Sequence, residues 1–220
     1  ATAVQRPCRS RVLAALHAID PSRIGLSDFG RPGNYFERQI KRWADQYRAS
    51  ETRSIDAMES LMQWLKQEMP EDDGQSALIH GDYRLDNLIM TPTRTRIQAV
   101  IDWELSTLGH PLADLAYFCM CLRMPHHEQI RGLAGVERST LGIPPEADMI
   151  GQYCALRDIP PISHWPFYLA FSFFRLAAIC QGVLKRALGG NASNEQAHQV
   201  GALTPLLAEL GLDIAMNGEE

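Results

Sequence analysis

The stretch HGDYRLDNLIM, residues 80–90, packs charged and polar side chains into eight positions and then turns at once into an apolar run. A second apolar segment, IQAVID at residues 97–102, follows after TPTRTR, whose composition is typical of a turn. We therefore predict a short β-hairpin centred near residues 93–94. Such a hairpin places Asn87, at the start of one strand, beside Asp102, at the end of the other.

Three polar side chains around this hairpin have the types that phosphoryl transfer needs. A carboxylate can orient an attacking hydroxyl and accept its proton while divalent cations neutralise charge on the phosphates. Asp82 is the candidate base. Asn87 and Asp102 are candidate Mg²⁺ ligands, because Mg²⁺ takes oxygen ligands and few protein carboxylates. Asn87 supplies an oxygen without a third negative charge, which would raise at least one carboxyl pKa.

Three further residues are candidates whose roles stay open. Glu104 joins the metal site if the chain beyond Asp102 stays extended, since residues two apart in a strand point the same way. Arg84 is either a surface residue or a contact for phosphate or a substrate anion. His80 is expected to be structural and to hydrogen-bond the loop. The alternative is that these residues have no catalytic role and only stabilise a turn and cap the backbone.

The composition is that of an ordinary globular chain. Of the 220 residues, 45% are hydrophobic and 21% are charged, and the formal net charge is −5. This balance gives no basic surface for a phosphate backbone, so we expect a small-molecule partner and no nucleic acid. Five scattered cysteines argue against a disulfide framework and for a reducing compartment, so a cytoplasmic location is expected.

Two other patterns are weighed and set aside. The apolar segment 165–184 has nearly the length of a membrane span, but Arg175 interrupts it, so we predict a buried helix and no membrane association. A set of thiols and imidazoles near residue 120 has zinc-ligand chemistry: Cys119, Cys121, His126 and His127. Positions two apart on a helix point away from each other, so we expect no zinc site there.

The rest of the chain has helical periodicity, and strand-like pieces are confined to residues 77–102. The helices are predicted at residues 10–19, 34–50, 54–69, 112–122, 146–157, 164–188 and 193–210. The first three are predicted to bury Val12, Leu13, Leu16 and Ile19; Phe36, Ile40, Trp43 and Tyr47; and Ile55, Met58, Met62 and Leu65. Asn34 is expected to cap the second helix. The fold class is therefore α+β and mostly helical.

The motif HGDYRLDNLIM followed by VIDWELSTLGHPLADLAY, residues 100–117, resembles segments of a known family. These are the catalytic and metal-binding segments of the aminoglycoside phosphotransferase and choline kinase branch of the protein-kinase-like fold. The wider text, including LAALHAID, GLSDFGRPGNYFERQIKRW and FYLAFSFFRLAAICQGVLKRALGGNAS, is similar to kinase-like domains that accompany certain acyl-CoA dehydrogenases. This likeness covers nearly the whole chain.

The resemblance implies a role for each matching position. Asp82 matches the catalytic aspartate, and Asn87 and Asp102 match the metal ligands of an ATP- and Mg²⁺-dependent enzyme. Asp114 matches a position that ties the next helix to the catalytic loop. Trp103 and Glu104 stand where protein kinases have the Phe and Gly of Asp-Phe-Gly. This departure is usual in the small-molecule branch, so it points away from protein substrates.

A phosphate-covering loop and a strand lysine for ATP are missing from the sequence. It contains neither G-x-G-x-x-G nor G-x-x-x-x-G-K-[ST], and its three lysines, Lys41, Lys66 and Lys185, fall in helical patterns. We therefore expect residues 1–220 to form a C-terminal kinase-like lobe, with the nucleotide lobe preceding residue 1. On this expectation the chain alone has little or no ATP-dependent activity.

Within that lobe we expect three consecutive parts. Residues 1–70 are helical, residues 76–122 hold the catalytic loop, the hairpin and the following helix, and residues 123–220 form a helical substrate-side subdomain. The expected reaction is phosphoryl transfer from ATP to a hydroxyl of a small molecule. By resemblance, the acceptor is a hydroxyacyl or hydroxy-acid compound, and an acyl-CoA dehydrogenase is a partner. A non-catalytic binding module and a metal-dependent phosphohydrolase remain as alternatives.

Overall fold

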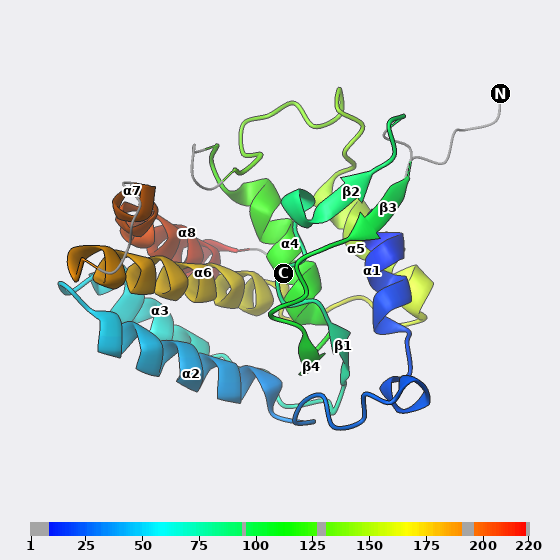
Figure 1. Ribbon diagram of the computed structural model, residues 1–220, viewed down its shortest axis with the longest axis horizontal. Helices are drawn as coiled ribbons and strands as arrows, with labels where there is room; N and C mark the ends of the chain where they lie inside the picture. Colours follow the sequence, from blue (N-terminus) through cyan, green and yellow to red (C-terminus); the bar gives the residue numbers. More distant parts are fainter. Residues whose placement is uncertain (1–8, 94–95, 127–130, 191–195, 219–220) are drawn as a thin grey trace. The chain divides into compact units, whose positions relative to one another are not determined.

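The computed structural model describes residues 9–93, 96–126, 131–190 and 196–218 (Figure 1). Two compact units interleave along the chain. Unit 1 comprises Ala1–Gly33, Gly74–Pro125 and Gly132–Ser163, and unit 2 comprises Asn34–Asp73, His126–Arg131 and His164–Glu220. The first helix groups with residues 74–125 in unit 1, and the division of the lobe into three consecutive parts stays a prediction.

Unit 1 is built on three helices: α1 (Arg9–His17), α4 (Leu112–Arg123) and α5 (Glu146–Arg157). All residues of α4 from Leu112 to Leu122 are buried, so this helix is the core of the unit. Helix α1 packs against both α4 and α5, and Figure 1 shows α1 and α5 side by side. Leu13 and Leu16 are buried as predicted, but α1 ends at His17, and Ile19 beyond it is 37% exposed.

Two small antiparallel sheets complete unit 1. Strand β2 (Leu88–Met90) pairs with β3 (Ile97–Val100), which confirms the predicted hairpin, and Leu88 lies opposite Val100. Residue 94, at the predicted centre of the hairpin, lies outside the described residues. Strand β1 (Ala77–Ile79) pairs with β4 (Thr107–Gly109), which the sequence did not predict. Strand β4 is only the three residues Thr-Leu-Gly, which is too short a run to show the alternation of apolar and polar side chains that identifies a strand.

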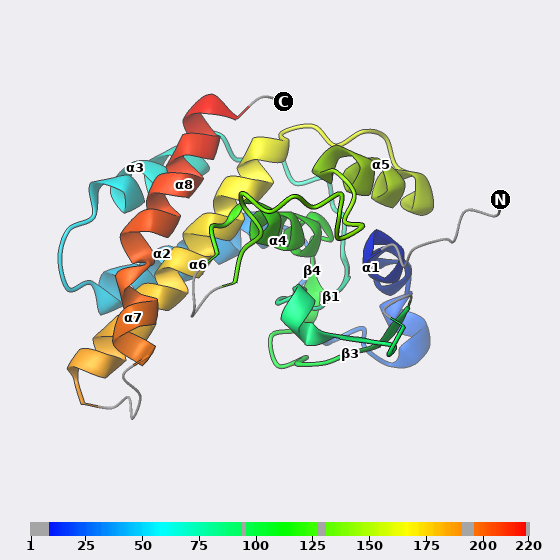
Figure 2. The same cartoon turned by 90° about the horizontal axis from the view of Figure 1, so that it is seen from above.

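Unit 2 consists of α2 (Tyr35–Ser50), α3 (Asp56–Gln67), α6 (Trp165–Leu188), α7 (Gln196–Ala202) and α8 (Thr204–Asn217). Helix α6 contacts all the others, and Figure 2 shows α8 running alongside it. By length and composition α6 could cross a membrane, but 83% of its most apolar window is buried inside the structure. The prediction of a buried core helix is therefore confirmed.

Several local predictions for unit 2 need correction. The buried stripe of α2 is as predicted, whereas α3 buries Leu61 and leaves Met62 half-buried. Asn34 adopts a left-handed conformation with φ 47°, and its side chain makes no capping bond, because an N-cap residue needs extended backbone. The helix predicted at 193–210 is two helices, since Pro205 in the first turn of α8 has no N–H to continue α7.

Candidate active site

Backbone pairing at the open end of the hairpin brings the candidate metal ligands close in the fold. The N–H of Ile101 donates to the carbonyl of Asn87 at 3.0 Å, so Asp102 directly follows the residue that lies opposite Asn87. Asp102 has φ +67°, a left-handed conformation in which aspartate is enriched. The chain therefore bends at Asp102, and residues 104–105 form a turn. The extended backbone on which the assignment of Glu104 depended is absent.

The side chain of Asn87 holds the candidate base in place. Its Nδ2 donates to the carboxylate Oδ2 of Asp82 at 2.8 Å and to the backbone carbonyl of the same residue at 2.9 Å. Asn87 is only 7% exposed, and a 3₁₀ turn over Leu85–Asn87 precedes β2. Both amide protons are used on Asp82. The Asn87 Oδ1 is consequently the atom of this amide that can act as an oxygen ligand.

His80 links the candidate catalytic loop to the strand that ends before Asp102. Its Nδ1 lies 3.2 Å from the N–H of Asp82, and its Nε2 lies 2.9 Å from the carbonyl of Ile101. The N–H can only donate and the carbonyl can only accept, so the imidazole carries its proton on Nε2 and is neutral. His80 is fully buried, and its ring contacts that of Trp103 at 4.7 Å between centroids.

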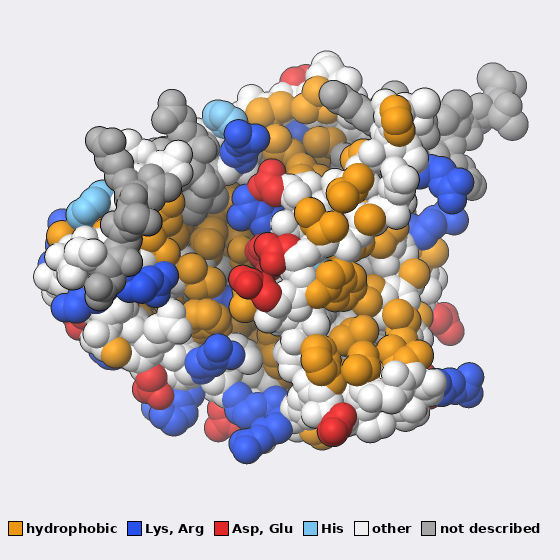
Figure 3. Space-filling view, viewed as in Figure 1, with side chains coloured by type: hydrophobic (Ala, Val, Ile, Leu, Met, Phe, Trp, Pro, Cys, Tyr) orange, Lys and Arg blue, Asp and Glu red, His pale blue; other side chains and the backbone are white. Residues whose placement is uncertain are grey.

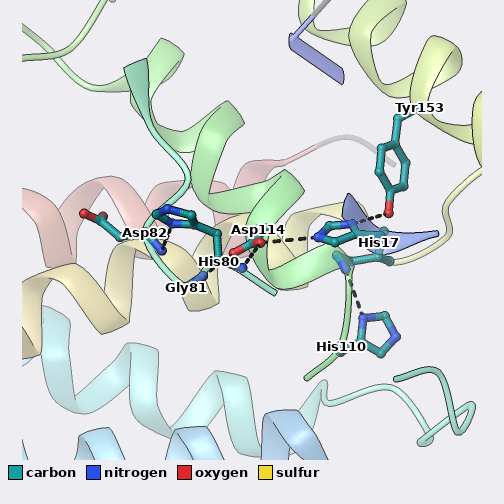
Figure 4. Close-up of polar contacts among 8 residues, drawn as sticks. His17, His80, Gly81, Asp82, His110, Asp114 and Tyr153 are labelled. Atoms are coloured by element: carbon teal, nitrogen blue, oxygen red, sulfur yellow. Dashed lines mark hydrogen bonds and ion pairs between the residues drawn. The ribbon is translucent and has the colours of Figure 1, made fainter. Parts of the chain in front are cut away.

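Asp114 on α4 accepts hydrogen bonds from the backbone of the same loop (Figure 4). The N–H groups of His80 and Gly81 donate to its two carboxylate oxygens at 2.6 and 2.8 Å, and His17 Nε2 lies 3.3 Å from Oδ2. Burial alone would raise the pKa of this carboxyl. The hydrogen bonds from His17 and from the two backbone donors outweigh burial, so the pKa is lowered from its ordinary value.

The lowered pKa of Asp114 predicts a specific pH dependence of stability. A carboxyl with a depressed folded-state pKa stabilises the protein above its ordinary pKa of 3.8, and that contribution is lost as the pH falls through the folded-state value. We expect Asp114→Asn to lower the free energy of unfolding at pH 7 by about 1–3 kcal/mol. The difference from wild type should shrink toward pH 3. Urea unfolding at several pH values measures it.

Asp45→Asn is the control for that measurement. Asp45 forms a surface ion pair with Lys41 at 2.7 Å, and its side chain is 67% exposed. Exposed pairs of this kind contribute about 0–1 kcal/mol, so this variant should unfold almost like wild type at pH 7. Equal losses in the two variants, or a loss for Asp114→Asn that does not vary with pH, would contradict the assignment.

Arg84 is bound to a neighbouring carboxylate of its own loop. Its Nε donates to Asp86 Oδ2 at 3.0 Å, and its Nη2 contacts the same oxygen. Burial would lower the pKa of the guanidinium, but the hydrogen bond to Asp86 contributes to a net rise. The Arg84 side chain is 22% exposed. It is therefore partly accessible, and its contact with a phosphate or a substrate anion stays a prediction.

Acidic side chains gather next to the β2–β3 hairpin, beside exposed hydrophobic side chains (Figure 3). Asp86, Asp102 and Glu104 are exposed and Asp82 is half-buried. Among the described residues there is no group of three or more His, Cys, Asp and Glu side chains placed to hold a metal ion. A cation here would rely on the Asn87 amide oxygen, the Asp102 carboxylate and non-protein oxygens. That all-oxygen set is the one that Mg²⁺ prefers.

The model of the phosphotransferase enzyme family matches residues 10–148, from α1 into α5 and across the whole catalytic loop and hairpin. The chain belongs to the phosphotransferase enzyme family. Its mostly helical fold with small sheets is accordingly that of a kinase-like phosphotransferase, as the sequence predicted.

Similar proteins include two curated acyl-CoA dehydrogenase family members. The chain is 48% identical over 94% of its length to mouse acyl-CoA dehydrogenase family member 10, and 43% identical over 92% to chicken member 11. A crystal structure of a candidate aminoglycoside phosphotransferase from Ralstonia eutropha is 48% identical over 97% of the chain, with a TM-score of 0.90. The chain spans 19% and 26% of the two dehydrogenase family members and 65% of the crystallised protein.

The three lysines of the chain all lie on helices, as predicted. Lys41 is on α2, Lys66 on α3 and Lys185 on α6. A strand lysine that holds ATP is therefore not found within residues 9–93, 96–126, 131–190 and 196–218. Trp103, in place of the kinase Phe, is 40% exposed, and its Nε1 donates to the carbonyl of Val100 at 2.9 Å. The bend at Asp102 is thus held by the indole that follows it.

The cysteines of unit 1 that were weighed as zinc ligands lie in the core. Cys119 and Cys121 are buried in α4, and burial raises the pKa of the Cys121 thiol to about 12. Burial likewise raises the pKa of Cys119. These thiols are poor sources of the thiolate that zinc requires. His127, the fourth member of the set, lies outside the described residues.

Two residues that contact this site network were missed by sequence reasoning. His17 on α1 and Tyr153 on α5 are buried, and the Tyr153 hydroxyl lies 2.7 Å from His17 Nδ1. The spacing from Leu13 to His17 is one helical turn, so the histidine shares the apolar face of α1. A titratable side chain on the apolar face of a helix was the sequence feature that could have identified His17. Its partner on α5, Tyr153, could not be predicted from the sequence.

Proposed function

We propose that the protein transfers the γ-phosphate of ATP to a hydroxyl group of a small molecule with the help of Mg²⁺. The observation that carries this proposal is the contact between Asn87 Nδ2 and Asp82 Oδ2 at 2.8 Å. It joins the candidate base to a candidate metal ligand in one fixed unit, and residue 101 pairs with residue 87 directly before Asp102. Family membership supports a small-molecule phosphotransferase in general.

The carboxylate of Asp82 is suited to act as a general base, because its two oxygens have different tasks. One carboxylate oxygen, Oδ2, is held by Asn87, so Oδ1 is the atom proposed to accept the proton of the acceptor hydroxyl. The side chain is half-buried, and the backbone N–H of Asp82 is fixed by His80. The base is therefore oriented before the substrates arrive. Orientation of this kind contributes a large part of the rate of phosphoryl transfer.

Asn87 Oδ1 and the Asp102 carboxylate are the proposed protein ligands of Mg²⁺, and Glu104 is not among them because the chain bends at Asp102. When bound, Mg²⁺ neutralises charge on the phosphates of ATP. We infer that ATP binding relies on groups other than a strand lysine in the described part of the chain, where all three lysines lie on helices. Buried thiols at Cys119, Cys121, Cys154 and Cys180 support the proposed reducing, cytoplasmic location.

The acceptor is proposed to be a hydroxy acid or a hydroxyacyl compound. The names of the similar acyl-CoA dehydrogenase family members support an acyl compound, and for the same reason a dehydrogenase is the proposed partner. Arg84, two residues beyond the candidate base, is a candidate contact for an anionic group of the acceptor.

An acceptor screen tests this function. The full-length protein is incubated with MgATP and, separately, with hydroxy acids, hydroxyacyl-CoA thioesters and aminoglycosides, and the products are identified by mass spectrometry. We expect a phosphorylated hydroxy acid or hydroxyacyl product together with ADP. Phosphate release without a phosphorylated acceptor would support a phosphohydrolase. ATP left unconsumed with every acceptor would support a binding module.

A further inference from the structure

A buried chain of polar contacts runs from α5 through α1 to the candidate catalytic loop. We propose that His17 is a positioning residue, which acts by holding the Asp114 carboxylate against the backbone of His80 and Gly81, directly before Asp82. The role in catalysis rests on the proposed function, whereas the role in ordering the loop does not. Figure 4 shows His17 on one side of Asp114 and the loop on the other.

The contacts around Asp114 divide its two oxygens between three donors. Oδ1 accepts the Gly81 N–H at 2.8 Å, while Oδ2 accepts both the His80 N–H at 2.6 Å and the N–H of His17 Nε2 at 3.3 Å. Asp114 is 1% exposed and His17 is 3% exposed, so water does not substitute for a lost donor without rearrangement. His17 is the side chain that fixes the rotation of this carboxylate from the side opposite the loop.

Tyr153 sets the tautomer that His17 needs for this task. Its hydroxyl lies 2.7 Å from His17 Nδ1. The Asp114 carboxylate can only accept, so His17 donates to it from Nε2, and His17 Nδ1 is left to accept the phenol proton of Tyr153. Burial raises the pKa of Tyr153, which keeps the hydroxyl protonated. The imidazole therefore carries its proton on Nε2, where it faces Asp114.

Packing alone would not require this set of partners. His17, Asp114 and Tyr153 come from three different helices, and each ring or hydroxyl group meets a complementary atom. A buried polar group costs free energy unless it is paired, so an apolar core would do better if stability were all that mattered. The network ends on the two residues that precede the candidate base. A rigid backbone at these two residues fixes the position of the base, and this is how the network would affect catalysis.

Hydrogen exchange in the full-length protein tests the ordering role without any substrate. His17→Leu removes the Nε2 donor, whereas His17→Gln can still present an N–H near the same place. We expect the peptide covering residues 78–84 to exchange roughly tenfold faster or more in His17→Leu, and to stay close to wild type in His17→Gln. Unchanged exchange in His17→Leu would overturn the proposal, and so would faster exchange spread evenly over all of unit 1.

Tyr153→Phe gives a second test in case His17→Leu fails to fold. This variant deletes one hydroxyl and keeps the ring, so His17 loses the partner that fixes its tautomer. Tyr47→Phe is its matched control, because the Tyr47 hydroxyl is buried in unit 2 and has no hydrogen-bond partner among the described residues. Faster exchange of residues 78–84 is expected in Tyr153→Phe and not in Tyr47→Phe. The same exchange in both variants would overturn the role of Tyr153.

Steady-state kinetics with the acceptor found in the screen separates positioning from stability. For His17→Leu we expect kcat to fall by about 10- to 100-fold with the KM for ATP nearly unchanged, and His17→Gln to recover most of the loss. The acid limb of the kcat profile should also move to higher pH in His17→Leu, because Asp114 loses one donor. His17 and the N–H groups of residues 80 and 81 donate to the Asp114 carboxylate, and Tyr153 contacts His17 from the far side.

The proposed function and the positioning role of His17 can be refuted independently of each other. If the wild-type protein transfers no phosphate to any acceptor, the proposed function fails and hydrogen exchange still decides whether His17 orders the loop. If transfer occurs but kcat and its acid limb are the same in His17→Leu and wild type, the positioning role in catalysis is overturned while the proposed function stands.

Discussion

Asp82→Asn in the full-length protein should lower kcat for phosphoryl transfer by about 10²- to 10⁴-fold, the range that a positioned general base contributes. The amide keeps the shape of the carboxylate and can still present an oxygen to Asn87 Nδ2, so the contact at 2.8 Å can persist. The loss should therefore come from the missing proton acceptor and not from a changed fold. Steady-state kinetics measures the loss of kcat, and thermal unfolding of the same preparations shows whether the fold has changed.

Asp86→Asn is the matched control for that prediction. It makes the same change of charge in the same loop, but Asp86 is exposed and binds Arg84, whereas the Asn87 amide donates to Asp82. We expect its kcat to stay within about tenfold of wild type, because exposed ion pairs contribute little. Equal losses in the two variants would show that loop charge, not a base at position 82, governs the rate.

Gly81→Ala should be the most damaging small substitution in the catalytic loop. Gly81 has φ +83°, and an added Cβ would lie 2.4 Å from the backbone carbonyl oxygen of Leu105. The left-handed backbone costs a non-glycine residue about 1–2 kcal/mol, and relieving such a contact costs about 1–3 kcal/mol more. The Gly81 N–H is also one of the donors to Asp114. Stability and phosphoryl transfer should therefore fall together.

Gly74→Ala separates the clash from the backbone strain. Gly74 has φ +73°, close to that of Gly81, but nothing lies within 4 Å of a Cβ added there. This variant should lose only the strain of about 1–2 kcal/mol and keep its kcat. Urea unfolding gives the difference between the two variants. If Gly74→Ala were as destabilised as Gly81→Ala, the close approach of residues 81 and 105 would be irrelevant.

Local patterns in the sequence were enough to predict the hairpin and most of the helices. The stripe of α2 follows from a helical period, and the β2–β3 hairpin follows from two strand-like runs with a turn between them. The same local logic failed where backbone conformation decides. Asn34 and Asp102 are left-handed, so one side chain does not cap its helix and the chain bends before Glu104.

Contacts between distant segments were the part that the sequence could not supply. His17 and Tyr153 are 136 positions apart, and no periodicity relates an α1 face to an α5 face. The role of Asp114 in tying α4 to the catalytic loop was predicted by resemblance alone, and the hydrogen bonds that it accepts from residues 80 and 81 give that role a physical basis. Strand β4 was missed for a similar reason, since its partner β1 precedes it by about 30 residues and only pairing defines it.

The most direct test of the central claim is a phosphorus NMR spectrum of the full-length protein with MgATP and one hydroxy acid or hydroxyacyl acceptor. The proposed function predicts that a phosphate monoester of the acceptor and ADP form in equal amounts, and that both are lost in Asp82→Asn. Formation of inorganic phosphate and ADP without the monoester, or a monoester signal that persists in Asp82→Asn, would contradict it.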